Sequence, residues 1–270
     1  MEGFADMLKR SIFRQYDIRG KVGVDFDEEG AGRIAAAFAR YAGKNGCRRM
    51  LVGRDNRSSS LAIRNQVVQV LERMGWEVVD IGEVITPMFY FASRHMGIDA
   101  GIMITASHNP PEYNGYKVYW EDGAQVTYPR DEEIITEVNS IKDFGTVKTM
   151  SKDDALASGL LTIIGKEIDD KYIAELKRLV INPVSDEGKK LKIVYTPLHG
   201  TGNLLVRRIL SELGFENVYV VPEQELPDPQ FSTVGYPNPE DPKVFALAKK
   251  LADEVNADII MATDPDADRL

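Results

Sequence analysis

The stretch that decides the fold is MLVGRDNRSSSLAIRNQVVQVLERMGWEVVDI, residues 50–81. It opens with a short apolar run at 50–53, which is typical of a buried strand. Three serines at 58–60 can cap a helix over residues 61–74, whose apolar side chains gather largely on one face. Residues 76–81 form the next apolar run and are predicted as a second strand. A strand, a helix and a strand joined by short loops indicate a parallel α/β unit.

The same alternation continues along the chain. Thr86-Pro87 can open another helix, because proline is favoured in the first helical turn. GIMIT at 101–105 is predicted as a strand, and YKVYW with QVTY around the turn EDGA, at 116–128, is predicted as a two-stranded element. In the second half the pattern predicts strands at 191–195, 217–221 and 257–262 and helices at about 203–213 and 242–255.

The two halves of the chain resemble each other. LERMGWEVVDIG at 71–82 parallels LSELGFENVYVV at 210–221, and DAGIMITASHNP at 99–110 parallels ADIIMATDPDAD at 257–268. A polar, poorly periodic stretch separates them. The predicted fold class is α/β, with two tandem related α/β domains that have mainly parallel or mixed sheets. We predict the domains to be residues 1–155 and 156–270.

Composition excludes several classes of protein. The 270 residues are 43% apolar and 28% charged, which is the balance of an ordered globular chain. The net charge of −9 argues against non-specific nucleic-acid binding. Cys47 is the sole cysteine, so no intrachain disulfide can form, and no apolar run approaches the roughly 20 residues needed to cross a bilayer. The N-terminus also lacks the apolar core of a signal peptide, so we expect a cytoplasmic protein with no membrane partner.

The first unusual tract is Thr105-Ala-Ser-His-Asn-Pro-Pro111, directly after a predicted strand. A hydroxyl at a strand end, in a loop stiffened by two prolines, is well placed to be a nucleophile or a phosphate carrier. An ordinary turn has the same composition. A hydrolase triad is disfavoured, because no G-x-S-x-G sequence surrounds Ser107.

The second unusual tract places Asp264, Asp266 and Asp268 at alternate positions after the last predicted strand. Three carboxylates at this spacing can converge on one hard cation, and Mg²⁺ prefers such oxygen ligands. A solvated acidic loop is the alternative. An EF-hand fits poorly, because Arg269 stands where that motif needs glycine. A haloacid-dehalogenase-type phosphatase would place its Asp-x-Asp loop near the start of its domain.

Basic residues also cluster in loops despite the acidic total. Arginine side chains suit phosphate because their planar fork donates two hydrogen bonds at once. Each residue alone is more typical of a plain surface charge, and it is their coincidence with strand ends that favours phosphate binding. They are Arg14, Arg19, Arg54, Arg57, Lys117 and Arg269.

Taken together, these tracts resemble the α-D-phosphohexomutase superfamily, in its phosphomannomutase/phosphoglucomutase branch. The TASHNP tract is highly specific, and the acidic loop differs from the usual D-G-D-x-D-R by Pro265 in place of glycine. Five tracts carry the resemblance, in the family's order: FRQYDIRG at 13–20, VGRDNRSSS at 52–60, ITASHNPPEYNGYKVY at 104–119, TPLHGTG at 196–202 and ATDPDADR at 262–269.

The resemblance implies a set of site residues. Ser107 would carry the phosphoryl group, and it would bind Mg²⁺ together with Asp264, Asp266 and Asp268. Proton transfer and charge stabilisation would fall to His108, Lys117 and Arg269. Substrate and phosphate would be bound by Tyr16, Arg19, Arg54 and Asn109.

The resemblance also implies an activity, the interconversion of hexose 1-phosphate and hexose 6-phosphate through a hexose 1,6-bisphosphate. The phosphorylated hexose would be that of glucose or mannose. Members of the family have four domains, so the expectation is an N-terminal catalytic half that is nearly inactive alone. A C-terminal half chain or a second copy would then be its partner. The alternatives are a Mg²⁺-dependent sugar-phosphate phosphatase and a non-catalytic fragment.

Overall fold

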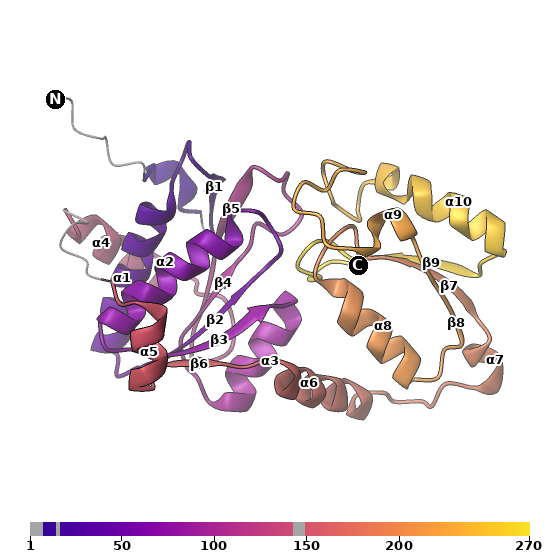
Figure 1. Ribbon diagram of the computed structural model, residues 1–270, viewed down its shortest axis with the longest axis horizontal. Coiled ribbons are helices and arrows are strands. Elements are labelled where there is room, and N and C mark those ends of the chain that lie inside the picture. Colours follow the sequence, from indigo (N-terminus) through magenta and orange to yellow (C-terminus); the bar gives the residue numbers. More distant parts are fainter. Residues whose placement is uncertain (1–7, 15–16, 143–148) are drawn as a thin grey trace.

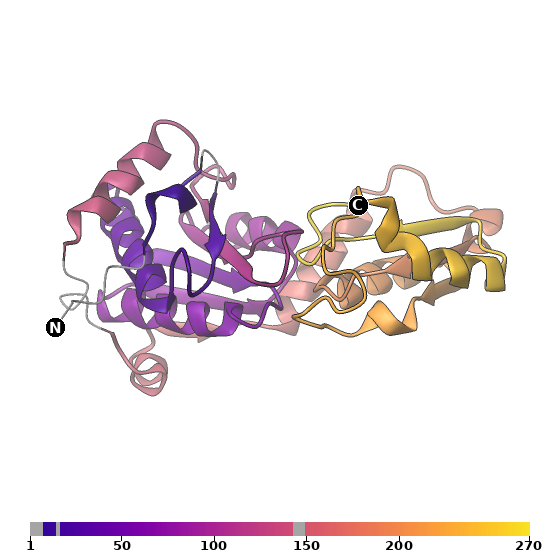
Figure 2. The same cartoon turned by 90° about the horizontal axis from the view of Figure 1, so that it is seen from above.

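The computed structural model describes residues 8–14, 17–142 and 149–270. Two α/β domains lie side by side along the long axis of the molecule (Figure 1). Seen from above, they remain distinct, and the C-terminal end of the chain lies in the second domain, on the side nearer the first (Figure 2). The predicted fold class of two α/β domains is therefore confirmed.

The sheet of the first domain is mixed. Its strand order is β1-β5-β4-β2-β3-β6. The pairs β2–β3, β2–β4 and β3–β6 are parallel, whereas β5 runs antiparallel to both β4 and β1. The strands are β1 (Ile18–Lys21), β2 (Arg49–Arg54), β3 (Glu77–Glu83), β4 (Gly101–Ile104), β5 (Tyr113–Tyr119) and β6 (Leu161–Ile163).

Helices cover both faces of this sheet. The larger apolar core joins α1 and α2 to one face, and α3 packs on the other face. Helix α3 has Pro87 in its first turn and ends at Gly97, whose φ of 62° suits a residue without a side chain. The helices of this domain are the 3₁₀ turn Arg10–Ile12, α1 (Glu28–Lys44), α2 (Ser60–Arg73), α3 (Thr86–Met96), α4 (Arg130–Ser140) and α5 (Lys152–Ser158).

The second domain has a smaller, parallel sheet of order β8-β7-β9. This order matches that of β3-β2-β4 in the first domain, so β4 and β9 occupy equivalent places. The strands are β7 (Lys192–Thr196), β8 (Asn217–Val220) and β9 (Ile259–Ala262). The helices are α6 (Lys166–Arg178), α7 (Asp186–Lys189), α8 (Gly202–Glu212), α9 (Pro222–Glu225), the 3₁₀ turn Pro242–Phe245 and α10 (Ala246–Val255).

An apolar cluster joins the two domains. Phe89 of α3 packs with Ile173 of α6 and Leu205 of α8 in one buried group. Figure 1 shows α6 running below both domains, between α3 and α8. Burial of this surface fixes how the two domains face each other.

Three details differ from the sequence predictions. QVTY does not form a strand and makes only the isolated bridge between Tyr119 and Gln125, whereas β1 pairs with residues 113–116 of β5. Strand β6 pairs with β3, so the first sheet draws on residues beyond the boundary predicted at 155. The side chain of Ser59, at the N-cap of α2, makes no capping hydrogen bond.

No helix in the described ranges is long and apolar enough to span a bilayer.

Candidate active site

The serine loop and the acidic loop follow equivalent strands, β4 in one domain and β9 in the other, and they meet between the domains. Ser107 Oγ donates a hydrogen bond to Asp264 Oδ2 at 2.7 Å and lies 3.3 Å from Asp268 Oδ1. The Ser107 amide donates to Thr105 Oγ1 at 2.9 Å. Both loops lie at carboxyl ends of parallel strands, where open α/β sheets place their ligands.

Several loop residues around this contact have a left-handed backbone. Ser107 has φ 50°, Ala267 has φ 52°, and Leu198 and His199 have φ 46° and 64°. Residues with a Cβ rarely adopt this conformation, and each such residue costs on the order of 1 kcal/mol or more. The surrounding packing therefore determines the shape of these loops.

The three aspartates form a compact group of oxygen atoms. One carboxylate oxygen of each lies within 4.8 Å of the others. Asp264 Oδ1 also accepts hydrogen bonds from the amides of Asp268 at 3.0 Å and Arg269 at 3.1 Å. The loop thus folds back on its first carboxylate and directs all three side chains to one point.

This group fits a divalent cation. Asp266 Oδ1 is buried and has no hydrogen-bond partner, and a buried carboxylate oxygen without a partner carries a large desolvation cost. A cation at the centre of the group would satisfy it. All the available ligands are hard oxygen atoms, which favours Mg²⁺ over softer metals.

Lys117 lies against the same acids. Its position on β5, opposite Met103 of β4, points its Nζ atom at Asp266 Oδ2 (2.8 Å) and Asp268 Oδ2 (2.5 Å). Burial opposes the charge on Lys117, but the two acids raise the pKa of its ammonium group above the ordinary value. The ammonium is therefore held charged inside the site.

The two most buried acids have opposite pKa shifts. Burial, together with the charges of Asp266 and Asp268, raises the pKa of Asp264. Burial would also raise the pKa of Asp266, but the Lys117 ammonium outweighs it and the net shift is downward. Lys117 thus keeps Asp266 ionised, whereas Asp264 would be stabilised most in its ionised form by a bound cation.

A cleft of about 390 Å³ opens in front of Ser107 and carries several cations. Arg19 donates to Asn109 Oδ1 at 2.5 Å and also pairs with Asp17. Arg269 pairs with Glu240 at 2.6 Å. The lining residues are Arg14, Asp17, Arg19, Ser107, Lys117, Gln125, Asp268 and Arg269. This charge distribution suits a phosphorylated ligand despite the acidic total charge.

His108 lies beside the serine. Its Nδ1 is 3.1 Å from Ser107 Oγ, and its ring meets the ring of Tyr236 edge-on at 5.8 Å between centroids. Burial, and then the charges of Arg269 and Arg19, lower the pKa of His108. A neutral imidazole next to the hydroxyl can accept its proton.

The structure gathers most of the residues predicted from the sequence, but not Arg54. Its guanidinium pairs with Glu83 at 2.9 Å, because an irregularity in the β2–β3 pairing sets these two residues opposite each other. Tyr16 lies outside the described residues.

Sequence reasoning missed several residues that support the site. Thr86, at the start of α3, donates to Asp266 Oδ2 at 2.7 Å, and its amide donates to the Asp266 carbonyl at 2.8 Å. Asn56 Nδ2 donates to the carbonyl of His199 at 2.7 Å, across the domain junction. The position of both residues could have indicated their role, because each follows a strand at the edge of the sheet where the site lies.

Comparison with known protein families gives two matches. Residues 10–144 match the family model described as phosphoglucomutase/phosphomannomutase, alpha/beta/alpha domain I. Residues 170–270 match the model of domain II of the same family.

Individual relatives agree with these matches. A phosphoglucomutase of Staphylococcus saprophyticus is 37% identical over 240 residues, which are 88% of this chain and 43% of that protein. Human phosphopentomutase is 42% identical over 188 residues, 68% of this chain and 30% of that protein. The crystal structure of a putative phosphomannomutase from Thermus thermophilus superposes with a TM-score of 0.78 at 26% identity, over 95% of this chain and 55% of that one. The chain therefore spans less than half the length of these two curated relatives.

Proposed function

The chain belongs to the phosphoglucomutase/phosphomannomutase family, and on that premise we propose that residues 1–270 carry the phosphoryl-transfer centre of a hexose-phosphate mutase. The observation that supports the proposal most is the 2.7 Å contact between Ser107 Oγ and Asp264 Oδ2, which joins residues 157 positions apart in two domains. A hydroxyl held against an acidic, cation-compatible group is the arrangement that phosphoryl transfer through a serine requires.

In the proposed reaction, Ser107 begins as a phosphoserine. The 6-hydroxyl of a hexose 1-phosphate attacks the phosphorus, the bond from phosphorus to Ser107 Oγ breaks, and the hydroxyl proton passes through His108 to the serine oxygen. The products are hexose 1,6-bisphosphate and a free serine. The bisphosphate then reorients in the site, and Ser107 Oγ attacks its 1-phosphoryl group as the bond from phosphorus to the sugar O1 breaks. The serine proton passes to O1, and hexose 6-phosphate leaves.

The chain's own residues have distinct roles in this scheme. His108 accepts or returns the proton at the serine oxygen, and Lys117 and Arg269 offset the negative charge of the transferring group. Arg19 and Asn109 orient the phosphate on the open side of the cleft. Asp264, Asp266 and Asp268 would hold Mg²⁺, which when bound neutralises charge on the transferring phosphoryl group.

The test is transfer of one phosphoryl group to Ser107. Purified chain is incubated with glucose 1,6-bisphosphate and MgCl₂, and its intact mass is measured. The expected result is a gain of one phosphoryl group in the original chain and in the control Ser140→Ala, which alters an exposed serine on α4. Ser107→Ala should gain none. Full labelling of Ser107→Ala would refute the assignment.

The same mixture separates the alternatives. Steady release of inorganic phosphate without label on Ser107 would indicate a Mg²⁺-dependent phosphatase. Mg²⁺ binding with neither label nor release would indicate a non-catalytic module, including one that needs a partner chain. The 240 matched residues cover 43% of the S. saprophyticus phosphoglucomutase, so we expect the isolated chain to turn over hexose phosphate far more slowly than that protein.

Specificity is tested with several sugars, because the relatives include phosphopentomutases as well as hexose mutases. We propose glucose or mannose phosphate as substrate. Comparison of glucose 1-phosphate, mannose 1-phosphate and ribose 1-phosphate as phosphoryl acceptors from labelled Ser107 decides between them.

A further inference from the structure

We propose that Arg57 is a positioning residue that fixes the conformation of the Ser107 loop. Through its contact with Phe231, this conformation depends on the packing of the second domain against the first. The proposal rests on the proposed role of Ser107. By sequence, Arg57 is one of the loop arginines that suit phosphate, but it does not line the cleft in front of Ser107.

Every N–H group of the Arg57 guanidinium is used. The guanidinium carries five N–H donors. Nε donates to Asp55 Oδ2 at 3.0 Å. The other four donate to backbone carbonyl oxygens of the serine loop and of the first residue of β5: those of Ser107 (2.5 Å), Asn109 (2.7 Å), Pro110 (2.7 Å) and Tyr113 (3.2 Å). One side chain therefore gathers four carbonyl oxygens around the plane of its guanidinium.

Asp55 holds the Arg57 guanidinium in place. Arg57 and Asp55 both have fully buried side chains. Asp55 Oδ1 in turn accepts from the Arg57 amide at 3.1 Å and from Ser60 Oγ at 2.5 Å. Ser60, the first residue of α2, thus supports the aspartate. A buried arginine held by a carboxylate has little freedom to change rotamer.

The second domain covers the same guanidinium. The Phe231 ring lies with its centroid 5.0 Å from Arg57 Cζ, and its side chain is fully buried. Phe231 has φ 48°, an unusual conformation for a residue with a side chain, so the loop that carries it is held by its surroundings. The Phe231 amide donates to the Asp228 carbonyl at 3.0 Å. The same loop therefore presents the aromatic face to the cation.

A neighbouring contact ties this loop to the first domain. The Asp228 amide donates to the His199 carbonyl at 3.2 Å, which also accepts from Asn56, the residue before Arg57. The segment 55–57 therefore touches the serine loop on one side and the second domain on the other. When the second domain packs against the first, Phe231 holds the guanidinium in the plane that its hydrogen bonds to the four carbonyls require.

The consequence concerns the 2.7 Å contact between Ser107 Oγ and Asp264. Lysine in place of Arg57 keeps the charge but offers three donors in no fixed plane. The loop carbonyls then lose partners, and Ser107 moves relative to the acids. Misplacement of a reacting group by about 1 Å costs roughly 100-fold in rate.

The experiment compares three single variants of the whole chain. Arg57→Lys removes the fork, and Phe231→Leu removes the aromatic cover while leaving all five donors in place. Arg49→Lys is the control, because that arginine lies at the start of β2 and pairs with Glu77 away from the site. Two quantities are measured: the rate of phosphorylation by glucose 1,6-bisphosphate, and amide hydrogen exchange in peptides covering residues 105–114.

We expect Arg57→Lys to slow phosphorylation by about 100-fold and Phe231→Leu by about tenfold, with the control unchanged. In both variants, exchange in 105–114 should accelerate while exchange in β2 and β3 stays the same. A merely structural role would instead accelerate exchange across the first domain. Phe231→Leu decides the question if Arg57→Lys does not fold.

The outcomes separate this inference from the proposed function. If the original chain takes up no phosphoryl group, the proposed function fails, and local exchange in 105–114 still decides whether Arg57 positions the loop. Exchange in 105–114 that matches the control in both variants overturns the inference. So does labelling at the original rate in a folded Arg57→Lys protein.

Discussion

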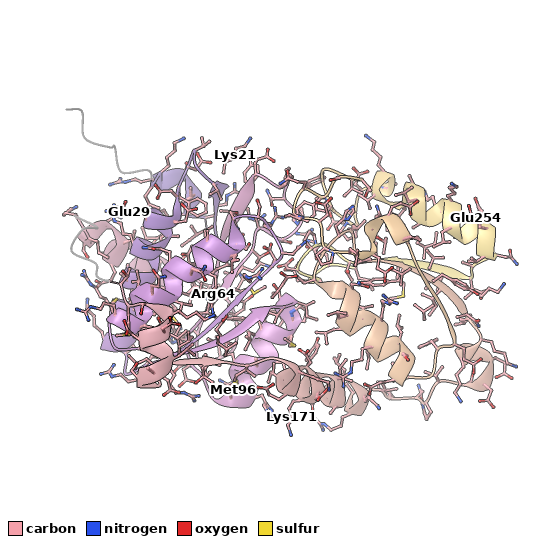
Figure 3. All side chains as sticks on the ribbon, in the orientation of Figure 1. Lys21, Glu29, Arg64, Met96, Lys171 and Glu254 are labelled. Carbon is pink, nitrogen blue, oxygen red and sulfur yellow. The ribbon has the colours of Figure 1, made fainter. Side chains whose placement is uncertain are left out.

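Glu72 offers the sharpest test of the physical reasoning, because it is buried without a partner. It lies near the end of α2, its side chain is 0% exposed, and neither carboxylate oxygen has a hydrogen-bond partner. Burial raises the pKa of Glu72 to about 7, and Arg64 only partly opposes this, since Arg64 is itself paired with Asp80. Figure 3 labels Arg64 on the same helix. We consider the substitution Glu72→Gln.

The sign of the effect follows from proton linkage. Between its ordinary value of 4.5 and about 7, the carboxyl is protonated in the folded chain and ionised in the unfolded chain. The folded state then holds the extra proton, so the contribution of this carboxyl to stability is greatest below pH 4.5 and falls by about 1.4 kcal/mol per pH unit up to about pH 7. The full loss is about 3 kcal/mol, and local opening that lets water reach the carboxylate would reduce it to about 2 kcal/mol.

The assay is denaturant unfolding followed by tryptophan fluorescence. Both tryptophans, Trp76 and Trp120, are buried in the first domain, so the signal reports on the domain that contains Glu72. The free energy of unfolding is measured from roughly pH 5 to roughly pH 8. The original chain should lose stability across this range, and Glu72→Gln should lose about 2 kcal/mol less.

Glu29→Gln is the matched control, because Glu29 is an exposed glutamate of the same domain, on α1 (Figure 3). It should keep the pH dependence of the original chain. If Glu72→Gln shows that same pH dependence, the carboxyl is not the buried, protonated group described above, and the reasoning is wrong.

Three further predictions concern the acidic loop and its support. Asp264→Asn should weaken Mg²⁺ binding at least tenfold in calorimetry, because it removes the ligand nearest to Ser107; unchanged affinity would count against the cation site. Lys117→Met should lower the free energy of unfolding by about 3 kcal/mol in metal-free buffer, because it leaves two carboxylates without their cation, and added Mg²⁺ should restore part of it. Gly200→Ala should cost about 1–3 kcal/mol, because its Cβ would lie 2.4 Å from Pro265 Cα, and a melting temperature equal to that of the original chain would contradict this.

The elements with strong periodicity could be predicted from sequence. The helix predicted at 61–74 is observed as Ser60–Arg73, and the one at 203–213 as Gly202–Glu212. At QVTY the predicted strand is absent apart from one bridge to Tyr119. The strand that pairs with β5, from Ile18↔Tyr116 to Lys21↔Tyr113, is β1, which comes from 95 residues earlier in the chain. No local sequence pattern reveals a pairing strand that lies so far away along the chain.

In the candidate site too, local features could be predicted from the sequence and long-range contacts could not. The placement of Ser107 and Asp264 after strands followed from the sheet pattern, and their contact then depended on how two domains pack. Contacts such as Thr86 with Asp266, or Phe231 with Arg57, join residues more than 170 positions apart and have no signature in the local sequence. Arg54 illustrates the reverse error, since an arginine next to the motif is directed to Glu83 by an irregular strand pairing.

The left-handed backbone at Ser107, Leu198, His199 and Ala267 has a thermodynamic consequence. Loops in such conformations are shaped while the polypeptide folds, so the entropy of ordering is lost before any ligand arrives. A small anion therefore binds loops that are already ordered. Its association rate should be set by diffusion and charge, with no slow conformational change of the loops after binding.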